Sequence, residues 1–159
     1  MIGPMEFSIL SIGKWKASPE KSLFESYLRR MPWQIQLVEL DSRERDDAQR
    51  QKQEEAQRLR DSCKQLAVRK IIVLDERGKD WPSRELAGTL RRWQDEQAVR
   101  KVAVIIGGHA GVADELRQEA DLCLSLGKLT WPHLLVRALV AEQLYRSYCI
   151  LTNHPYHRD

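Results

Sequence analysis

The sequence predicts an α/β fold with a mostly parallel sheet flanked by helices. Two short apolar runs, at residues 70–75 and 102–106, are typical of strands that are buried on both faces. Helical patterns separate these runs from one another and from further strand-like segments, as in βαβ units. Glycines follow several of the runs, and they favour sharp exits from a sheet. Together these observations indicate a single sheet with helices on its faces.

The first half of the chain contains clear start and stop signals. Residues 6–12 form a predicted strand that ends at Gly13, and residues 34–40 alternate as a second strand. Between them, a helix begins at Ser18 with proline in its first turn and ends before Pro32. Residues 41–64 mix acidic and basic side chains, which predicts a solvated helix rather than an RNA-binding arm.

The second half repeats the strand–helix alternation. After the strand at 70–75, Gly78 is expected in a loop, and a helix is expected from Pro82 through Trp93. The strand at 102–106 precedes the glycine pair that begins at Gly107. The remaining expected elements are a helix at 112–120, a strand at 122–126, a loop at 127–131, an apolar helix at 132–146 and a last strand at 148–152.

Length and composition restrict the class of protein. The 159 residues fit one domain, predicted at 5–159, with residues 1–4 as an N-terminal extension or a cloning remnant. The net charge of +3 permits an RNA partner without requiring one. No apolar run has the length of a membrane span, and the three cysteines form no CxxC pair, so we expect a cytoplasmic protein without disulfides or membrane contact.

Three loops are candidates for a ligand site. In parallel sheets ligands bind outside the carboxyl ends of the strands. This rule selects the loop after Leu74, the segment Gly107 to Gly111, and the segment Gly127 to Pro132. The glycine segment has no P-loop or dinucleotide signature, and by itself it is more typical of a strand-to-helix turn than of a ligand site.

The C-terminal tail has an unusual composition. His154, Tyr156, His157 and Arg158 lie within the last six residues. The two histidines, with His133, could form a metal site, but cysteines and carboxylates at ligand spacing are missing, so no metal is predicted. The tail is better suited to RNA recognition, with Tyr156 stacking on a base and Arg158 contacting a phosphate.

The helix at 132–146 carries apolar residues on nearly every side, which favours burial on more than one face and a subunit interface on one of them. Glu142 and Arg146 have the spacing of a helical ion pair. Arg137 needs a partner if it is buried.

Five motifs resemble a known family, the small SPOUT-class methyltransferases that methylate N3 of a pseudouridine in bacterial large-subunit (23S) ribosomal RNA. The resemblance covers nearly the whole chain from Met5. Its motifs are Leu74 to Gly78 with Trp81, Ile105 to Gly108 with Gly111, Leu129 to Arg137, Glu142 to Arg146, and Asn153 to Arg158. One departure follows the glycine pair, where His109 and Ala110 replace the Pro-Glu or similar acidic pair usual in the family.

The resemblance implies an α/β knot with a deep C-terminal trefoil, and S-adenosylmethionine as the cofactor. It implies a homodimer through helix 132–146 in which the partner's tail helps to complete each site. The implied cofactor-binding residues are Leu74, Gly107, Gly108, Gly127, Lys128, Leu129, Thr130, Trp131 and Pro132. They coincide with the three loops that the sheet rule selects.

The tail and His133 supply the expected substrate contacts. Tyr156, Arg158 and His133 are predicted to bind the RNA. N3 of pseudouridine must lose a proton, so His154 or His157 of the neighbouring subunit is predicted as general base, with Arg158 stabilising the developing anion as an alternative. The expected substrate is the large-subunit RNA in the assembled ribosome. A SPOUT enzyme for another RNA, such as tRNA, and a non-catalytic ribosome-associated protein are the two alternatives.

Overall fold

The protein forms one five-stranded parallel sheet, as a computed structural model that describes residues 2–41 and 46–159 shows. The strand order is β2-β1-β4-β3-β5, and every neighbouring pair is parallel. The strands are β1 (Glu6–Ile12), β2 (Gln34–Leu40), β3 (Lys70–Lys79), β4 (Lys101–Ile106) and β5 (Leu122–Leu124). The predicted α/β class with a parallel sheet is therefore confirmed.

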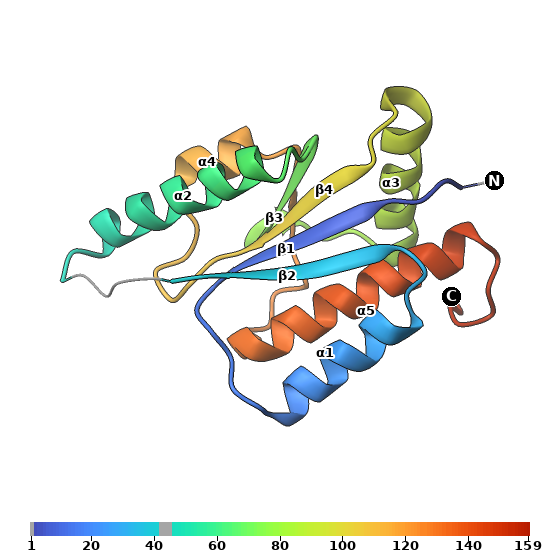
Figure 1. Ribbon diagram of the computed structural model, residues 1–159, viewed down its shortest axis with the longest axis horizontal. Coiled ribbons are helices and arrows are strands. Elements are labelled where there is room, and N and C mark those ends of the chain that lie inside the picture. Colours follow the sequence, from blue (N-terminus) through green and yellow to red (C-terminus); the bar gives the residue numbers. More distant parts are fainter. Residues whose placement is uncertain (1, 42–45) are drawn as a thin grey trace.

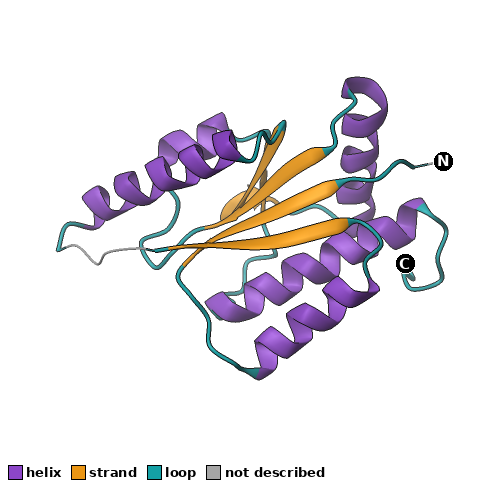
Figure 2. Cartoon of the chain, in the orientation of Figure 1, coloured by secondary structure: helices purple, strands orange, loops and turns teal. Residues whose placement is uncertain are grey.

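Helices cover both faces of this sheet (Figure 1, Figure 2). One layer contains α1 (Pro19–Arg30), α3 (Ser83–Gln97) and α5 (His133–Leu151), and α5 packs against both α1 and α3. The opposite layer contains α2 (Ala48–Gln65) and α4 (Asp114–Glu119). The three-layer arrangement places α5, the longest helix, across the sheet.

Alternation along the strands produces two hydrophobic cores. In β4, Val102, Val104 and Ile106 pack into the core under α1, α3 and α5. The intervening Ala103 and Ile105 pack into the core under α2 and α4. Successive strand side chains point to opposite faces, so a strand covered on both sides must be apolar throughout. This explains the continuous apolar runs in the sequence.

Side-chain caps fix the starts of two helices. Ser18 accepts a hydrogen bond from the Lys21 amide at 3.2 Å, with Pro19 in the first turn of α1. Asp47 accepts one from the Gln49 amide at 2.9 Å and caps α2. The mixed-charge segment thus contains the predicted helix from Ala48 onward, while residues 42–45 lie outside the described residues.

The predicted last strand at 148–152 is wrong, because α5 continues to Leu151. Tyr148 packs edge-on against Trp33 at a ring-centroid distance of 5.2 Å, and Cys149 is fully buried. These two positions continue the core-facing side of α5, one turn beyond Leu144 and Tyr145. A short apolar run cannot be distinguished from a buried helix segment by its pattern alone.

The predicted loop position of Gly78 is also wrong, because β3 runs to Lys79. The register shifts between Leu74 and Lys79, after which β3 pairs with β5 again, with Lys79 opposite Leu124 and the Ser125 amide donating to the Lys79 carbonyl at 3.0 Å. Strand β5 itself ends at Leu124, two residues earlier than expected.

The segment before β1 is attached to helix α3 by hydrogen bonds. The backbone of Gly3 makes two hydrogen bonds with the Gln94 side chain, at 2.9 and 2.8 Å.

The domain bounds and the deep trefoil knot stay predictions. Cys63, Cys123 and Cys149 are free thiols. Within residues 2–41 and 46–159, no helix has the length and apolarity needed to cross a membrane.

Candidate functional site

A cavity of about 700 Å³ lies beside the segments that leave β3, β4 and β5. Residues 74–77 of β3, residues 106–112 after β4, and the β5–α5 connection all contribute to its walls. His133 and Val136 from the first turn of α5 and Lys52 from α2 also line it. The three segments selected from the sequence therefore meet at one cavity, although residues 75–77 belong to β3 and not to a loop.

Most of the residues expected at a cofactor line this cavity. They are Leu74, Gly107, Gly108, Gly127, Leu129, Thr130 and Trp131. Two expected residues do not line it. Lys128 lines a neighbouring cavity of about 560 Å³ on the other side of the same connection, and Pro132 is the residue before α5.

The glycine segment after β4 lies close to the surrounding chain. A Cβ atom on Gly107 would come within 2.6 Å of Val112 Cγ2, and one on Gly108 within 3.1 Å of Ile12 Cγ2. The Gly111 amide closes the turn by donating to the Gly108 carbonyl at 3.0 Å, with Gly111 at φ +83°. Backbone therefore forms this wall of the cavity.

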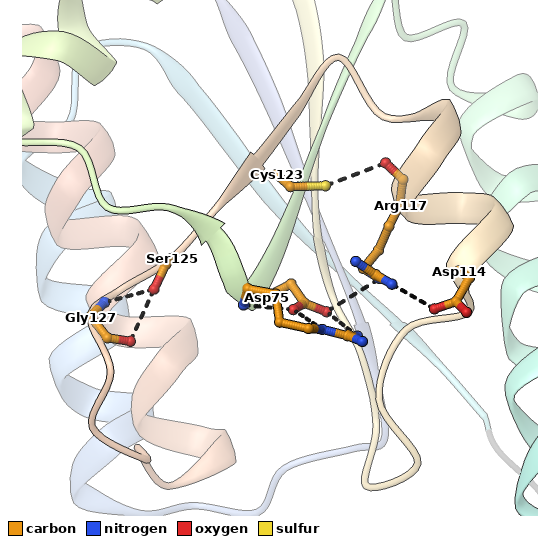
Figure 3. Close-up of polar contacts among 7 residues, drawn as sticks. Asp75, Asp114, Arg117, Cys123, Ser125 and Gly127 are labelled. Atoms are coloured by element: carbon orange, nitrogen blue, oxygen red, sulfur yellow. Dashed lines mark hydrogen bonds and ion pairs between the residues drawn. The ribbon is translucent and has the colours of Figure 1, made fainter.

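The connection between β5 and α5 is held by its own hydrogen bonds. The Ser125 hydroxyl accepts from the Gly127 amide at 3.0 Å and donates to the Gly127 carbonyl at 2.9 Å (Figure 3). Gly127 has φ +103°, a region that L side chains avoid. The Trp131 indole donates to the Leu126 carbonyl at 3.2 Å. These contacts turn the chain so that Leu129 and Trp131 reach the cavity.

Charged residues line one side of the cavity. Asp75 accepts hydrogen bonds from the Arg77 amide at 2.8 Å and from its guanidinium at 3.0 and 3.1 Å, with the Arg117 guanidinium 3.7 Å away (Figure 3). Arg117 also donates to Asp114 at 2.6 Å. Burial opposes ionisation of Asp75, but the hydrogen bonds from Arg77 outweigh it and keep the pKa of this carboxyl below its ordinary value.

Sequence reasoning missed several lining residues. Asp75, Glu76 and Arg77 directly follow Leu74, so the sheet rule could have included them. Lys52 gave no such signal, because it lies on α2 within the mixed-charge segment and reaches the cavity only through the tertiary fold. Its Cε atom would lie 3.9 Å from a Cβ atom on Gly111.

His133 is fixed at the cavity wall by β1. Its Nε2 donates to the Ile12 carbonyl at 3.1 Å, with the Ser11 hydroxyl 3.5 Å away. Burial and the nearby Arg137 guanidinium lower the pKa of His133 below its ordinary value, and the contact with Ile12 only partly offsets this. His133 is therefore neutral at pH 7.

The tail follows the C-terminal end of α5 (Figure 1), whereas the first turn of this helix lines the cavity. His133 begins this helix, and the 19 residues of α5 span about 28 Å before the tail leaves it. His154, Tyr156, His157 and Arg158 are therefore not brought together with the cavity within one chain. No group of three metal-ligating side chains gathers anywhere in the described part of the chain.

The tail folds back onto its own helix. Tyr156 donates its hydroxyl proton to Glu142 at 2.5 Å, and the Arg146 guanidinium donates to Glu142 at 2.8 Å and to His157 Nδ1 at 3.0 Å. The predicted Glu142–Arg146 pair is thus confirmed. His157 Nε2 contacts Asp159 at 2.8 Å. The tail is held as a defined structure with Arg158 exposed.

Comparisons with known proteins agree on one family. The family model described as "Predicted SPOUT methyltransferase" matches residues 5–157. A protein of Paramagnetospirillum magneticum named "Ribosomal RNA large subunit methyltransferase H" is 44% identical over 154 residues, which cover 97% of this chain and 99% of that protein. A protein of the same name from Allorhizobium ampelinum is 39% identical and covers 98% and 100% of the two chains.

Solved structures share the fold. A probable methyltransferase from Bordetella pertussis superposes with a TM-score of 0.53 at 18% identity, over 90% of this chain and 96% of that one. A probable methylase family protein from Haemophilus influenzae gives a TM-score of 0.56 at 14% identity, over 98% and 71%. With the family match over nearly the full length and relatives near 40% identity, the chain belongs to the SPOUT methyltransferase family.

Proposed function

We propose that this protein transfers a methyl group from S-adenosylmethionine to N3 of a pseudouridine in large-subunit ribosomal RNA. The substrate in this proposal is the assembled ribosome in the cytoplasm. The observation that carries it is the meeting of three segments, the later part of β3 and the loops after β4 and β5, at one cavity of about 700 Å³ in a chain of this family. The relatives named as large-subunit RNA methyltransferases support the choice of RNA.

The cavity suits S-adenosylmethionine in size and chemistry. Leu74, Leu129 and Trp131 offer apolar surface for an adenine ring, and Gly107 and Gly108 border the same cavity. Lys52 and Arg77 are cations near which the carboxylate of the methionine part would be favoured. When bound, this cofactor supplies a methyl group that its sulfonium has already activated.

The position of the tail supports a homodimer with shared sites. Each α5 begins at a cavity and ends at a tail, so two α5 helices packed antiparallel about a two-fold axis would place each tail beside the partner's cavity. Leu129 and Trp131, both exposed large apolar residues next to the start of α5, provide surface for such an interface. We propose this dimer, with Tyr156 and Arg158 of one subunit contacting RNA at the other's cavity.

The direct test is labelled methyl transfer to intact ribosomes, isolated large subunits, naked ribosomal RNA and tRNA, followed by mass mapping of the product. We expect N3-methylpseudouridine in the large-subunit RNA, with the highest rate on assembled ribosomes. The net charge of +3 gives little nonspecific attraction to RNA, so a large preformed surface should be the better substrate.

Other outcomes of this test support different functions. Transfer only to tRNA would contradict the substrate and identify a SPOUT enzyme for another RNA. Ribosome binding without cofactor binding would contradict the enzyme itself and identify a non-catalytic ribosome-associated protein. Calorimetric titration with S-adenosylmethionine separates these two results.

A further inference from the structure

Three of the four histidines, His133, His154 and His157, differ in which ring nitrogen is free to accept a proton. A carbonyl or carboxylate oxygen facing a neutral ring nitrogen requires that nitrogen to carry the hydrogen, and an N–H donor requires a lone pair on it. The contacts of each ring therefore assign its tautomer. This assignment bears on the proton that N3 of the substrate must lose.

Both tail histidines have their accepting nitrogen occupied. Arg146 donates to Nδ1 of His157 at 3.0 Å, while Nε2 of the same ring donates to Asp159 at 2.8 Å. The Tyr156 amide donates to Nδ1 of His154 at 3.1 Å, which leaves the proton on Nε2. Neither ring can accept a proton from a substrate without first giving up a hydrogen bond that holds the tail.

His133 has the opposite arrangement. Its Nε2 faces the Ile12 carbonyl and so carries the hydrogen. Its Nδ1 therefore has a lone pair, for which the described residues supply no hydrogen-bond donor. The ring lines the cavity in which the cofactor is proposed to bind, and β1 holds it in place.

We propose that Nδ1 of His133 is the acceptor of the substrate proton, an inference that rests on the proposed function. N3 of the pseudouridine gives its proton to Nδ1, and the freed electron pair of N3 forms the bond to the methyl carbon. The bond between that carbon and the cofactor sulfur breaks, and its electron pair stays on sulfur. The imidazolium then releases the proton to solvent, so charge and atoms balance.

The surroundings of His133 match this role. Arg137 on α5 and His109 in the loop after β4 are the titratable groups whose charge acts on His133, whereas β1 presents the Ser11 hydroxyl and the Ile12 carbonyl. Burial and the Arg137 guanidinium both disfavour the imidazolium and lower the pKa of His133, so the ring is neutral and ready to accept a proton at pH 7. His109 lines the same cavity, with its ring centroid 6.4 Å from that of His133. It is exposed and can carry the proton outward.

The test combines His133→Gln with its neighbour variant His109→Gln. The glutamine amide nitrogen can keep the donor contact to Ile12, but it offers no basic nitrogen. We expect single-turnover methyl transfer by His133→Gln to fall by about 100-fold or more, as for loss of a general base. Its remaining rate should rise about tenfold per pH unit as hydroxide takes over, whereas the wild-type rate should level off above the lowered pKa of His133.

Further readouts separate this inference from the proposed function and from misfolding. The affinity for S-adenosylmethionine and the thermal midpoint should stay near the wild-type values in His133→Gln. Nitrogen NMR of the wild-type protein should show His133 protonated at Nε2 and unprotonated at Nδ1 at pH 7. This result does not depend on the activity of His133→Gln. An Nδ1–H tautomer, a wild-type pH profile in His133→Gln, or a larger loss in His109→Gln would overturn the assignment. An inactive wild-type enzyme on every RNA would instead contradict the proposed function.

Discussion

Arg137 is a fully buried cation in the second turn of α5, and each of its polar contacts comes from the first forty residues of the chain. Its guanidinium donates to the Ser11 hydroxyl at 3.0 Å, the Gly13 carbonyl at 3.0 Å and the Glu39 carboxylate at 2.9 Å. The Trp15 ring lies 4.9 Å away. One side chain thus ties α5 to the ends of β1 and β2, next to His133.

Removal of this guanidinium should destabilise the fold strongly. We expect Arg137→Ala to lower the free energy of unfolding by about 3 kcal/mol, because it leaves the Glu39 carboxylate and the Gly13 carbonyl without their buried partner. Urea unfolding followed by circular dichroism measures this loss. The matched control is Arg91→Ala, whose pair with Asp95 is exposed, and which should change stability by less than about 0.5 kcal/mol. Equal effects of the two variants would contradict the structural role of Arg137.

The hydrogen-bond partners of individual side chains were only partly predictable from the sequence. The need of Arg137 for a partner followed from its place in an apolar helix, but Ser11, Gly13 and Glu39 are far away in sequence. The histidines show the same limit. Their residue type suggested a general base in the tail, whereas the hydrogen bonds that occupy their nitrogens exist only in the folded chain.

At the level of elements, β3 and β5 lie backbone against backbone at Gly78. A Cβ atom on Gly78 would lie 2.7 Å from the backbone carbon and oxygen of Cys123 and 2.8 Å from the Leu124 nitrogen. Backbone on both sides leaves no flexible side chain to move away. The sequence places Gly78 in a loop by its residue type, but the close approach to β5 depends on contact with Cys123, 45 positions further along the chain.

A methyl group on residue 78 should push the backbones of β3 and β5 apart. We expect Gly78→Ala to destabilise the protein by about 1–3 kcal/mol and to weaken cofactor binding, because β5 leads directly into the Gly127 to Pro132 segment. Gly88→Ala is the control, since its added Cβ would meet only Arg92 Nη1 at 3.6 Å within helix α3. That variant should be neutral or stabilising by up to about 1 kcal/mol. A stable Gly78→Ala protein with normal cofactor affinity would show that β3 and β5 can move apart at residue 78 without loss of stability.

Helix α5 illustrates why the end of an element is harder to predict than its presence. Its all-round apolarity was read correctly from the sequence as a buried helix, but the run near Tyr148 suggested a strand. Core contacts with Trp33 keep the residues near Tyr148 helical. The three loops, by contrast, were predictable because parallel strands deliver their carboxyl ends to one edge of a sheet.

For the whole molecule, the separation of cavity and tail is the feature that determines how the protein can work. Helix α5 is about 28 Å long, with the cavity at its start and the tail at its end, and the tail folds back only as far as Glu142 near the middle of the helix. The tail is nevertheless ordered by Glu142, Arg146 and Arg84, the last through a 2.7 Å contact with Asp159. An ordered tail at the other end of α5 from the cavity is explained if it contributes residues to the site of the neighbouring subunit.

Subunit complementation tests this shared site most directly. One variant, Gly127→Val, should lose cofactor binding because valine is strained at φ +103°. The other, Arg158→Ala, should keep near-normal cofactor affinity and lose RNA methylation. Each homodimer alone should be inactive. After the two variants are mixed and allowed to exchange subunits, half of the dimers contain one subunit of each variant. Each mixed dimer has two sites, and one of them combines an intact cavity with an intact tail from the partner. We expect about a quarter of the wild-type transfer to ribosomes. If the mixture stays as inactive as its components although mixed dimers are detected by native mass spectrometry, the tail does not serve the partner's cavity.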